Sequence, residues 1–134
     1  MTLKPLVTAV VVIIAALSLP AKAEDVSVWV SGYGNKSCGE YIRAAENERK
    51  STPANADPTV FYSREYSRYS DYLTGFLAGE NMANAANGQD GEVGFSQNVD
   101  GMLAWLENYC RRNPTDEFIT ALLKLRKDLA DKHR

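Results

Sequence analysis

Apolar residues recur at intervals of three and four along most of the chain after residue 36, which is the spacing of one face of an α-helix. Polar or glycine-rich stretches interrupt this pattern at residues 51–58 and 87–96, and an Asn-Pro dipeptide interrupts it at 113–114. Four helices are therefore expected: from residue 37 to about 50, over about 59–84, over 99–112, and from 113 onward. The sequence predicts an all-α fold, a small four-helix domain.

The predicted first, third and fourth helices each carry one apolar stripe. Ser37 and Glu40 have the spacing of a capping box, in which a hydroxyl and a carboxylate satisfy backbone donors at a helix start. Asn113 is expected to cap the fourth helix, with Pro114 in its first position and residues 116–117 in its positive first turn. The expected buried positions are Cys38, Tyr41, Ile42 and Ala45 in the first helix, Val99, Met102, Leu103, Leu106 and Cys110 in the third, and Phe118, Leu122, Leu125 and Leu129 in the fourth.

The predicted second helix is the longest, and its stripe is rich in aromatic residues. The stripe consists of Tyr62, Tyr66, Tyr69, Leu73 and Phe76. Gly75 and Gly79 lie beside it on consecutive turns, and we expect them to let another helix approach closely despite costing about 1 kcal/mol each in helix propensity. Core packing is the favoured interpretation of the tyrosines, but an exposed aromatic binding surface remains open for Tyr62, Tyr66, Tyr69 and Tyr72, with Tyr72 the most exposed of them.

Residues 1–23 have the three-part pattern of a secretory signal peptide. Lys4 supplies the positive charge, residues 6–19 form an apolar run of 14, and Ala21-Lys22-Ala23 is a small-x-small cleavage site. The apolar run is shorter than the roughly 20 residues needed to span a bilayer, so we expect cleavage after Ala23 rather than retention as an anchor. The short signal with a single lysine is typical of bacteria, and the periplasm is the expected destination.

The exported chain would then consist of an N-terminal arm over residues 24–36 and a helical domain over 37–134. Val26, Val28 and Val30 alternate with other residues in a strand-like period. Because a lone strand cannot form a sheet, we expect an extended or loosely docked arm, with Trp29 packing on the body. Losing two lysines with the signal lowers the Lys and Arg count from 15 to 13 against 17 Asp and Glu, a net charge near −4 that argues against nucleic acid as a partner.

The two cysteines, Cys38 and Cys110, lie on the apolar faces of the predicted first and third helices. In an oxidising compartment such a pair is expected to form a disulfide. Closing the loop between them would contribute about 4 kcal/mol to stability in the chain-entropy estimate. The bond would also remove both thiols as nucleophiles or metal ligands.

Residues that could carry catalytic or metal chemistry are scarce. The only histidine, His133, is the penultimate residue, so neither a zinc site nor a histidine-based catalytic pair is expected. Asp90, Glu92 and Asp100 flank the glycine-rich stretch and could hold calcium, but the EF-hand spacing is absent and a solvated loop is the favoured interpretation. We expect a protein without enzymatic activity, metal or cofactor, whose partners are other proteins.

The order of these features resembles the HdeA/HdeB-type periplasmic acid-stress chaperones and their relatives. It comprises the signal peptide, a cysteine opening the first helix (Ser37–Tyr41), a glycine-bearing central helix (Tyr72–Gly79) and a second cysteine late in the third helix, within Trp105–Pro114. The resemblance covers about residues 37–130. It implies a compact helical fold, often dimeric near neutral pH, with one disulfide at positions that Cys38 and Cys110 match. It also implies a holdase, which unfolds in acid, exposes apolar surface and keeps other periplasmic proteins soluble.

A second resemblance implies a different binding role. The glycine-bearing central helix, followed by a helix, Asn113-Pro114 and another helix, is similar to the Tai-type immunity proteins that neutralise type VI secretion effectors in the periplasm. It implies a protein that plugs the active site of a secreted enzyme and performs no chemistry itself. The sequence leaves open the chaperone, the immunity protein and a helical binding module of another kind.

Overall fold

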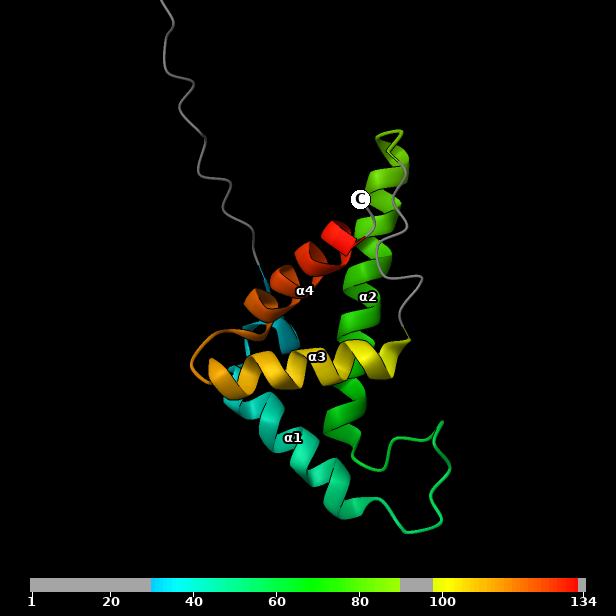
Figure 1. Cartoon of the computed structure of the whole chain (residues 1–134), viewed down its shortest axis with the longest axis vertical. Helices are drawn as coiled ribbons and strands as arrows, with labels where there is room; N and C mark the ends of the chain where they lie inside the picture. The colour runs from blue at the N-terminus through cyan, green and yellow to red at the C-terminus, as the bar shows by residue number, and fades with distance from the viewer. Residues whose placement is uncertain (1–29, 90–97, 133–134) are drawn as a thin grey trace, which may run out of the picture.

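The computed structural model describes residues 30–89 and 98–132, which form four α-helices and one short 3₁₀ helix (Figure 1). The elements are η1 (Gly32–Asn35), α1 (Cys38–Ser51), α2 (Arg64–Ala86), α3 (Val99–Arg112) and α4 (Phe118–Lys132). The predicted all-α class, with four helices and one disulfide, is confirmed. The predicted signal peptide, the hypothetical calcium ligands Asp90 and Glu92, and His133 lie outside the described residues.

The helices cross one another rather than lying parallel. In Figure 1, α2 runs along most of the height of the molecule and α3 runs across it, with α1 on one side of α3 and α4 on the other. α3 packs against both α1 and α4, α1 packs against α2, and η1 lies against α2 and α4. No helix in the described ranges combines the length and apolarity needed to cross a membrane.

One hydrophobic core joins all four helices. The stripes expected for the first, third and fourth helices face this core, with only Ile42 and Val99 left partly exposed. From α2 the core receives Tyr69, Leu73 and Leu77. Therefore α1, α3 and α4 bury the faces that their sequence periodicity indicates, whereas only Tyr69 and Leu73 of the stripe predicted for the second helix are buried.

The predicted capping box opens α1. The backbone N–H of Glu40 donates to the hydroxyl of Ser37 (3.3 Å), and the backbone N–H of Ser37 donates to the carboxylate of Glu40 (2.9 Å). Asn98 caps α3 in a similar way, because its side-chain oxygen accepts from the backbone N–H of Gly101 (2.7 Å). α3 has the predicted bounds.

The second helix begins five residues later than predicted, at Arg64 rather than at residue 59. Residues before it are held in a turn, because the side chain of Asp57 accepts from both the backbone N–H (2.8 Å) and the hydroxyl (2.6 Å) of Thr59. Ser63 is the cap, and its hydroxyl accepts from the backbone N–H of Tyr66. Tyr62 therefore lies outside the helix and not on its stripe.

The start of the fourth helix was also predicted wrongly. Asn113 ends α3 instead of capping α4, since its backbone N–H donates to the carbonyls of Tyr109 (3.1 Å) and Cys110 (3.3 Å). α4 begins at Phe118, so Asp116 and Glu117 precede it. Residues 114–118 are held by backbone hydrogen bonds to residues 36–39, and these tertiary bonds prevent the helix from starting at the proline.

The expected role of the two glycines in α2 is wrong as well. Gly75 and Gly79 are exposed, and no neighbouring atom of residues 30–89 or 98–132 lies within 4 Å of the point that a Cβ would occupy on either. The glycine that another element approaches closely is Gly34 in η1, where a Cβ would collide with the hydroxyl of Tyr72 and the side chain of Val30.

We predict that Phe118→Ala lowers the free energy of unfolding by about 3–5 kcal/mol, because Phe118 is fully buried and its removal leaves a cavity among aromatic rings. Urea unfolding at neutral pH measures the change. Lys124→Ala, at an exposed position of the same helix, is the control and should change stability by at most about 0.5 kcal/mol. Equal unfolding midpoints for the two variants would contradict the observed core.

Candidate functional site

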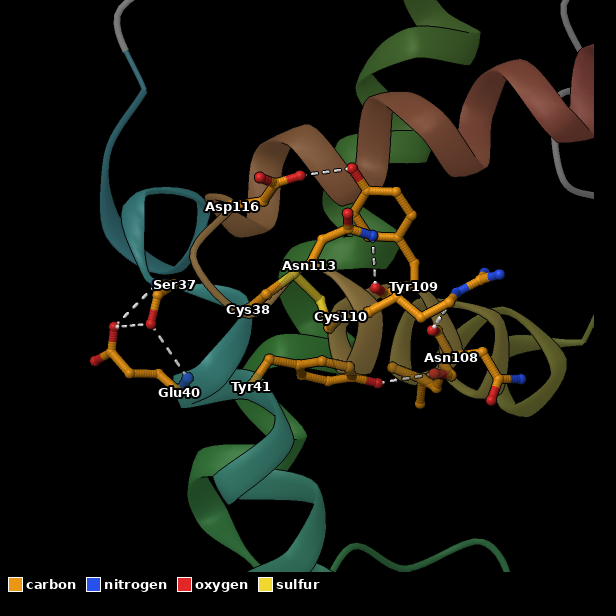
Figure 2. Close-up of a disulfide and its surroundings, with 11 residues drawn as sticks. Ser37, Cys38, Glu40, Tyr41, Asn108, Tyr109, Cys110, Asn113 and Asp116 are labelled. Atoms are coloured by element: carbon orange, nitrogen blue, oxygen red, sulfur yellow. Dashed lines mark hydrogen bonds between the residues drawn. A yellow bond between two sulfur atoms is a disulfide. The ribbon is translucent and has the colours of Figure 1, made fainter.

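The disulfide is the centre of the most constrained region of the fold, which we call the disulfide junction: residues 36–41 and 109–118. Cys38, the first residue of α1, is bonded to Cys110 near the end of α3, with an S–S distance of 2.04 Å and a Cα–Cα distance of 4.8 Å. Figure 2 shows this bond and its surroundings. Both residues are fully buried. The predicted bond is confirmed, and it joins positions 72 residues apart in the sequence.

Backbone hydrogen bonds surround the disulfide. The N–H of Cys38 donates to the carbonyl of Asp116 (2.8 Å), and the N–H of Gly39 donates to that of Pro114 (2.9 Å). From the other side, the N–H of Phe118 donates to the carbonyl of Lys36 (2.8 Å). Neither these backbone groups nor the disulfide carries a charge that titrates in acid.

Two acidic side chains also belong to the disulfide junction. The Asp116 carboxylate accepts from the hydroxyl of Tyr109 (2.7 Å), which raises the pKa of that tyrosine (Figure 2). The backbone N–H of Ser37, followed by the ammonium of Lys36 at 3.1 Å, lowers the pKa of Glu40 below its ordinary value. A carboxyl whose pKa is lower in the folded state stabilises the fold at neutral pH and loses that contribution in acid.

Away from the disulfide junction, carboxylates connect the helices. The carboxylate of Glu48 in α1 accepts from the backbone N–H groups of Tyr62 (2.9 Å) and Ser63, immediately before α2. Arg49 of α1 pairs with Glu107 of α3 at 2.8 Å. Further along, α2 and α4 are joined by an ion pair between Glu80 and Arg126 at 2.6 Å, and α1 and α3 by a longer one between Glu46 and Arg111 at 3.9 Å.

The four tyrosines of the predicted second helix do not gather on one exposed face, and three of them lie in or against the core, the interpretation that the sequence favoured. Tyr69 is fully buried, and burial raises the pKa of its hydroxyl, which has no hydrogen-bond partner among the described residues. Tyr66 and Tyr72 are partly buried against the core, Tyr66 stacking on Tyr41 and Tyr72 lying against Phe118. The hydroxyl of Tyr62 accepts from a backbone N–H of the preceding loop.

Most of these tyrosines instead belong to an aromatic cluster that the sequence did not reveal. Tyr41 lies at its centre, with its ring centroid 5.1 Å from that of Tyr69 and 4.9 Å from that of Phe118. The hydroxyl of Tyr41 donates to the backbone carbonyl of Leu103 (2.9 Å). Tyr33 of η1 covers the cluster with its ring 4.7 Å from that of Tyr69. A single tyrosine between two glycines carries no periodicity, so the contribution of η1 could not be read from the pattern.

The expected absence of a metal site concerns the acidic residues and the surface depressions of the described part of the chain. No group of three His, Cys, Asp or Glu among them is placed to hold a metal ion, and Asp100 is exposed in the first turn of α3. Two depressions open to solvent, one of about 240 Å³ beside Tyr33, Arg64, Glu65 and Arg68, and one of about 480 Å³ beside Asn108, Arg111 and Arg112.

Comparison with protein-family models, with curated proteins and with solved structures found no match to this chain.

We predict that replacing both cysteines, as in Cys38→Ser with Cys110→Ser, lowers the free energy of unfolding by about 2–5 kcal/mol, because the open chain gains entropy in the unfolded state. Urea unfolding at neutral pH measures the loss. Parent protein treated with a thiol reductant under unfolding conditions should show the same midpoint as the double variant. A double variant as stable as the oxidised parent would contradict a stabilising disulfide.

The lowered pKa of Glu40 predicts a pH-dependent loss for Glu40→Gln. At pH 7 the variant should be less stable than the parent, because the amide cannot replace the charge-assisted bond at the capping box. The difference should shrink as the pH falls through the folded-state pKa of Glu40, where the parent loses the same contribution. Urea midpoints over a pH series measure this, with Asp71→Asn on the exposed side of α2 as the control. A difference that persists unchanged into acid would exclude the charge as its cause.

Proposed function

We propose that the protein is an exported, non-enzymatic chaperone that opens in acid and holds other unfolding proteins soluble. The observation that carries this proposal is that some contacts between the elements of the fold depend on carboxylates and others do not. The disulfide junction keeps a covalent bond and three backbone hydrogen bonds in addition to the carboxylates of Glu40 and Asp116. The ion pairs among the helices beyond it, and the attachment of residues 62–63 to α1, depend on carboxylates.

The link from α1 to α2 shows how acid would act. The carboxylate of Glu48 accepts two backbone N–H groups at residues 62 and 63, and these groups lie where α2 begins. Carboxyl groups have reference pKa values of about 4, and a protonated carboxyl loses its charge and part of its acceptor capacity. Acid therefore weakens the attachment of the first turn of α2 to α1.

The ion pairs between helices also depend on the charge of a carboxylate. Each exposed pair contributes only about 0.2–1 kcal/mol, so the loss of one would not open the domain. Acid removes several together, including Arg49–Glu107 and Arg126–Glu80. Protonation of the carboxylates also changes the net charge of residues 24–134 from about −4 to about +13 before His133 is counted, and the resulting repulsion favours the open chain.

Opening would expose the aromatic cluster, which provides surface for binding a client. Tyr41, Tyr69 and Phe118 are fully buried in the folded protein and lie in contact with one another. A contiguous apolar surface of this kind binds exposed apolar segments of other proteins. The disulfide would keep α1 attached to α3, so that the opened chain recovers its fold when the pH rises.

A second candidate, the immunity protein, is favoured by the loop between α1 and α2. Val60 and Phe61 are 49% and 38% exposed there, although the loop is held by the hydrogen bonds of Asp57 and Glu48. A loop that is already ordered loses little entropy on binding, so an exposed apolar tip suits insertion into a pocket of a folded partner. This role requires the native fold at neutral pH.

We predict that the purified protein suppresses light scattering by an aggregating periplasmic client at about pH 2–3, where carboxyl groups are protonated, and not at neutral pH. Near-UV circular dichroism should show loss of tertiary structure over the same pH range. The Cys38→Ser, Cys110→Ser variant should recover its fold less completely after neutralisation.

Undiminished scattering at equimolar or higher protein, with native near-UV signal retained at that pH, would contradict the chaperone. That result would leave the immunity role as the better candidate. Its own test is inhibition of a secreted hydrolase at neutral pH that is weakened by Phe61→Ser.

A further inference from the structure

A depression where η1 lies against the start of α2 brings two exposed arginines beside a tyrosine ring. It has a volume of about 240 Å³ and is lined by Tyr33, Arg64, Glu65 and Arg68. Arg64 is the first residue of α2 and Arg68 lies one turn later, so their side chains are neighbours on the helix surface. Neither arginine forms an ion pair with a carboxylate of residues 30–89 or 98–132.

The charges around the depression favour a single negative charge in it. The two arginines and Glu65 together carry one net positive charge. The ammonium of Lys36 lies over the ring of Tyr33, 5.6 Å from its centroid, but it is already paired with Glu40 at 3.1 Å. The first turn of α2 adds the positive end of the helix dipole. One carboxylate would therefore neutralise the depression, whereas a phosphate group, with nearly two charges, would leave an excess of negative charge beside Glu65.

A buried hydroxyl lies beside this depression. Tyr69 is fully buried, and its ring meets that of Tyr33 edge-on with the centroids 4.7 Å apart. The hydroxyl of Tyr69 has no hydrogen-bond partner among the described residues. Burial raises the pKa of this hydroxyl, and so do Glu40, Glu65 and Tyr33, whereas Arg43 lowers it. Because Tyr33 and Glu65 act on the hydroxyl and also line the depression, the hydroxyl is directed toward it and stays protonated as a donor.

These groups have the chemistry that recognises a carboxylate. A guanidinium donates two parallel hydrogen bonds to a carboxylate, and a hydroxyl donates a short one to a charged oxygen. Pockets for whole small molecules have volumes of about 300–1,000 Å³, so this smaller depression suits a single side chain. The depression opens to solvent, so the rest of the molecule that carries the side chain stays outside it.

We propose that this depression binds an aspartate or glutamate side chain of another protein. Arg64 and Arg68 hold the carboxylate, and the ring of Tyr33 packs against the methylene groups beside it. The hydroxyl of Tyr69 donates to the deeper carboxylate oxygen once the ring of Tyr33 shifts to admit it. This binding uses the native fold at neutral pH, so it does not depend on the acid-opened chaperone proposed above.

A peptide of alternating glutamate and glycine is the probe, added to the full chain at pH 7. Its binding is followed by nitrogen-15 NMR of the arginine Nε–H groups, and we expect the signals of Arg64 and Arg68 to shift. Arg64→Gln with Arg68→Gln should raise the dissociation constant at least tenfold. Arg112→Gln with Lys127→Gln removes the same charge at exposed positions of α3 and α4 and should change it less than twofold. The same peptide with glutamine in place of glutamate should not bind.

Tyr69→Phe separates the hydroxyl from the aromatic ring. The variant should unfold in urea at the same midpoint as the parent or a higher one, because the hydroxyl makes no hydrogen bond with the described residues. It should nevertheless weaken peptide binding several-fold. Unchanged binding would exclude the hydroxyl as a contact of the carboxylate.

Three other results would overturn the proposal as a whole. One is the absence of a shift at Arg64 and Arg68. Another is equal binding of the glutamine peptide, or equal weakening by the distant double variant, since either would show that no local carboxylate site exists. The third is displacement of the peptide by inorganic phosphate at lower concentration than by acetate, which would indicate a phosphate site instead.

Discussion

The covalent link between Cys38 and Cys110 fixes the relation of α1 to α3, and the rest of the packing follows from it. With the start of α1 held at the end of α3, Tyr41 lies under α3, where its buried hydroxyl reaches the carbonyl of Leu103. A buried hydroxyl without a partner would cost about 1–3 kcal/mol, so this bond makes the central position of Tyr41 tolerable. The rings of Tyr69 in α2 and Phe118 in α4 pack against the ring of Tyr41.

The features that could be predicted from the sequence are those set by periodicity and local capping. The stripes of α1, α3 and α4, the bounds of α3 and the capping box at Ser37 depend on residues within one helix. The starts of α2 and α4 could not be predicted, because groups distant in the sequence set them. The carboxylate of Glu48 binds the residues just before α2. Backbone hydrogen bonds from Cys38 and Gly39 hold the residues just before α4. A periodic stripe also predicts which face of a helix is buried, but it does not predict which element packs there. For this reason Gly75 and Gly79 were wrongly expected to contact another helix.

The same distinction explains why the candidate site was predicted only in part. The disulfide was predicted from the expected compartment and from the apolar helix faces on which the two cysteines lie. The tyrosines of α2 were recognised as a group, but their exposure depends on Tyr33 and Tyr41, which reach them from η1 and α1. Aromatic residues from three elements that meet in one cluster leave no repeat in the sequence.

The surfaces considered for binding lie in different parts of the fold and depend on different states of it. The loop carrying Val60 and Phe61 precedes α2 (Figure 1). This surface exists only while α2 is attached to its neighbours, so a partner of the loop must bind the native protein. The aromatic cluster has the opposite requirement, because it becomes accessible only after those attachments are released. Since the attachments include carboxylates, pH would decide which set of surfaces is available: native ones near neutrality and the aromatic cluster in acid.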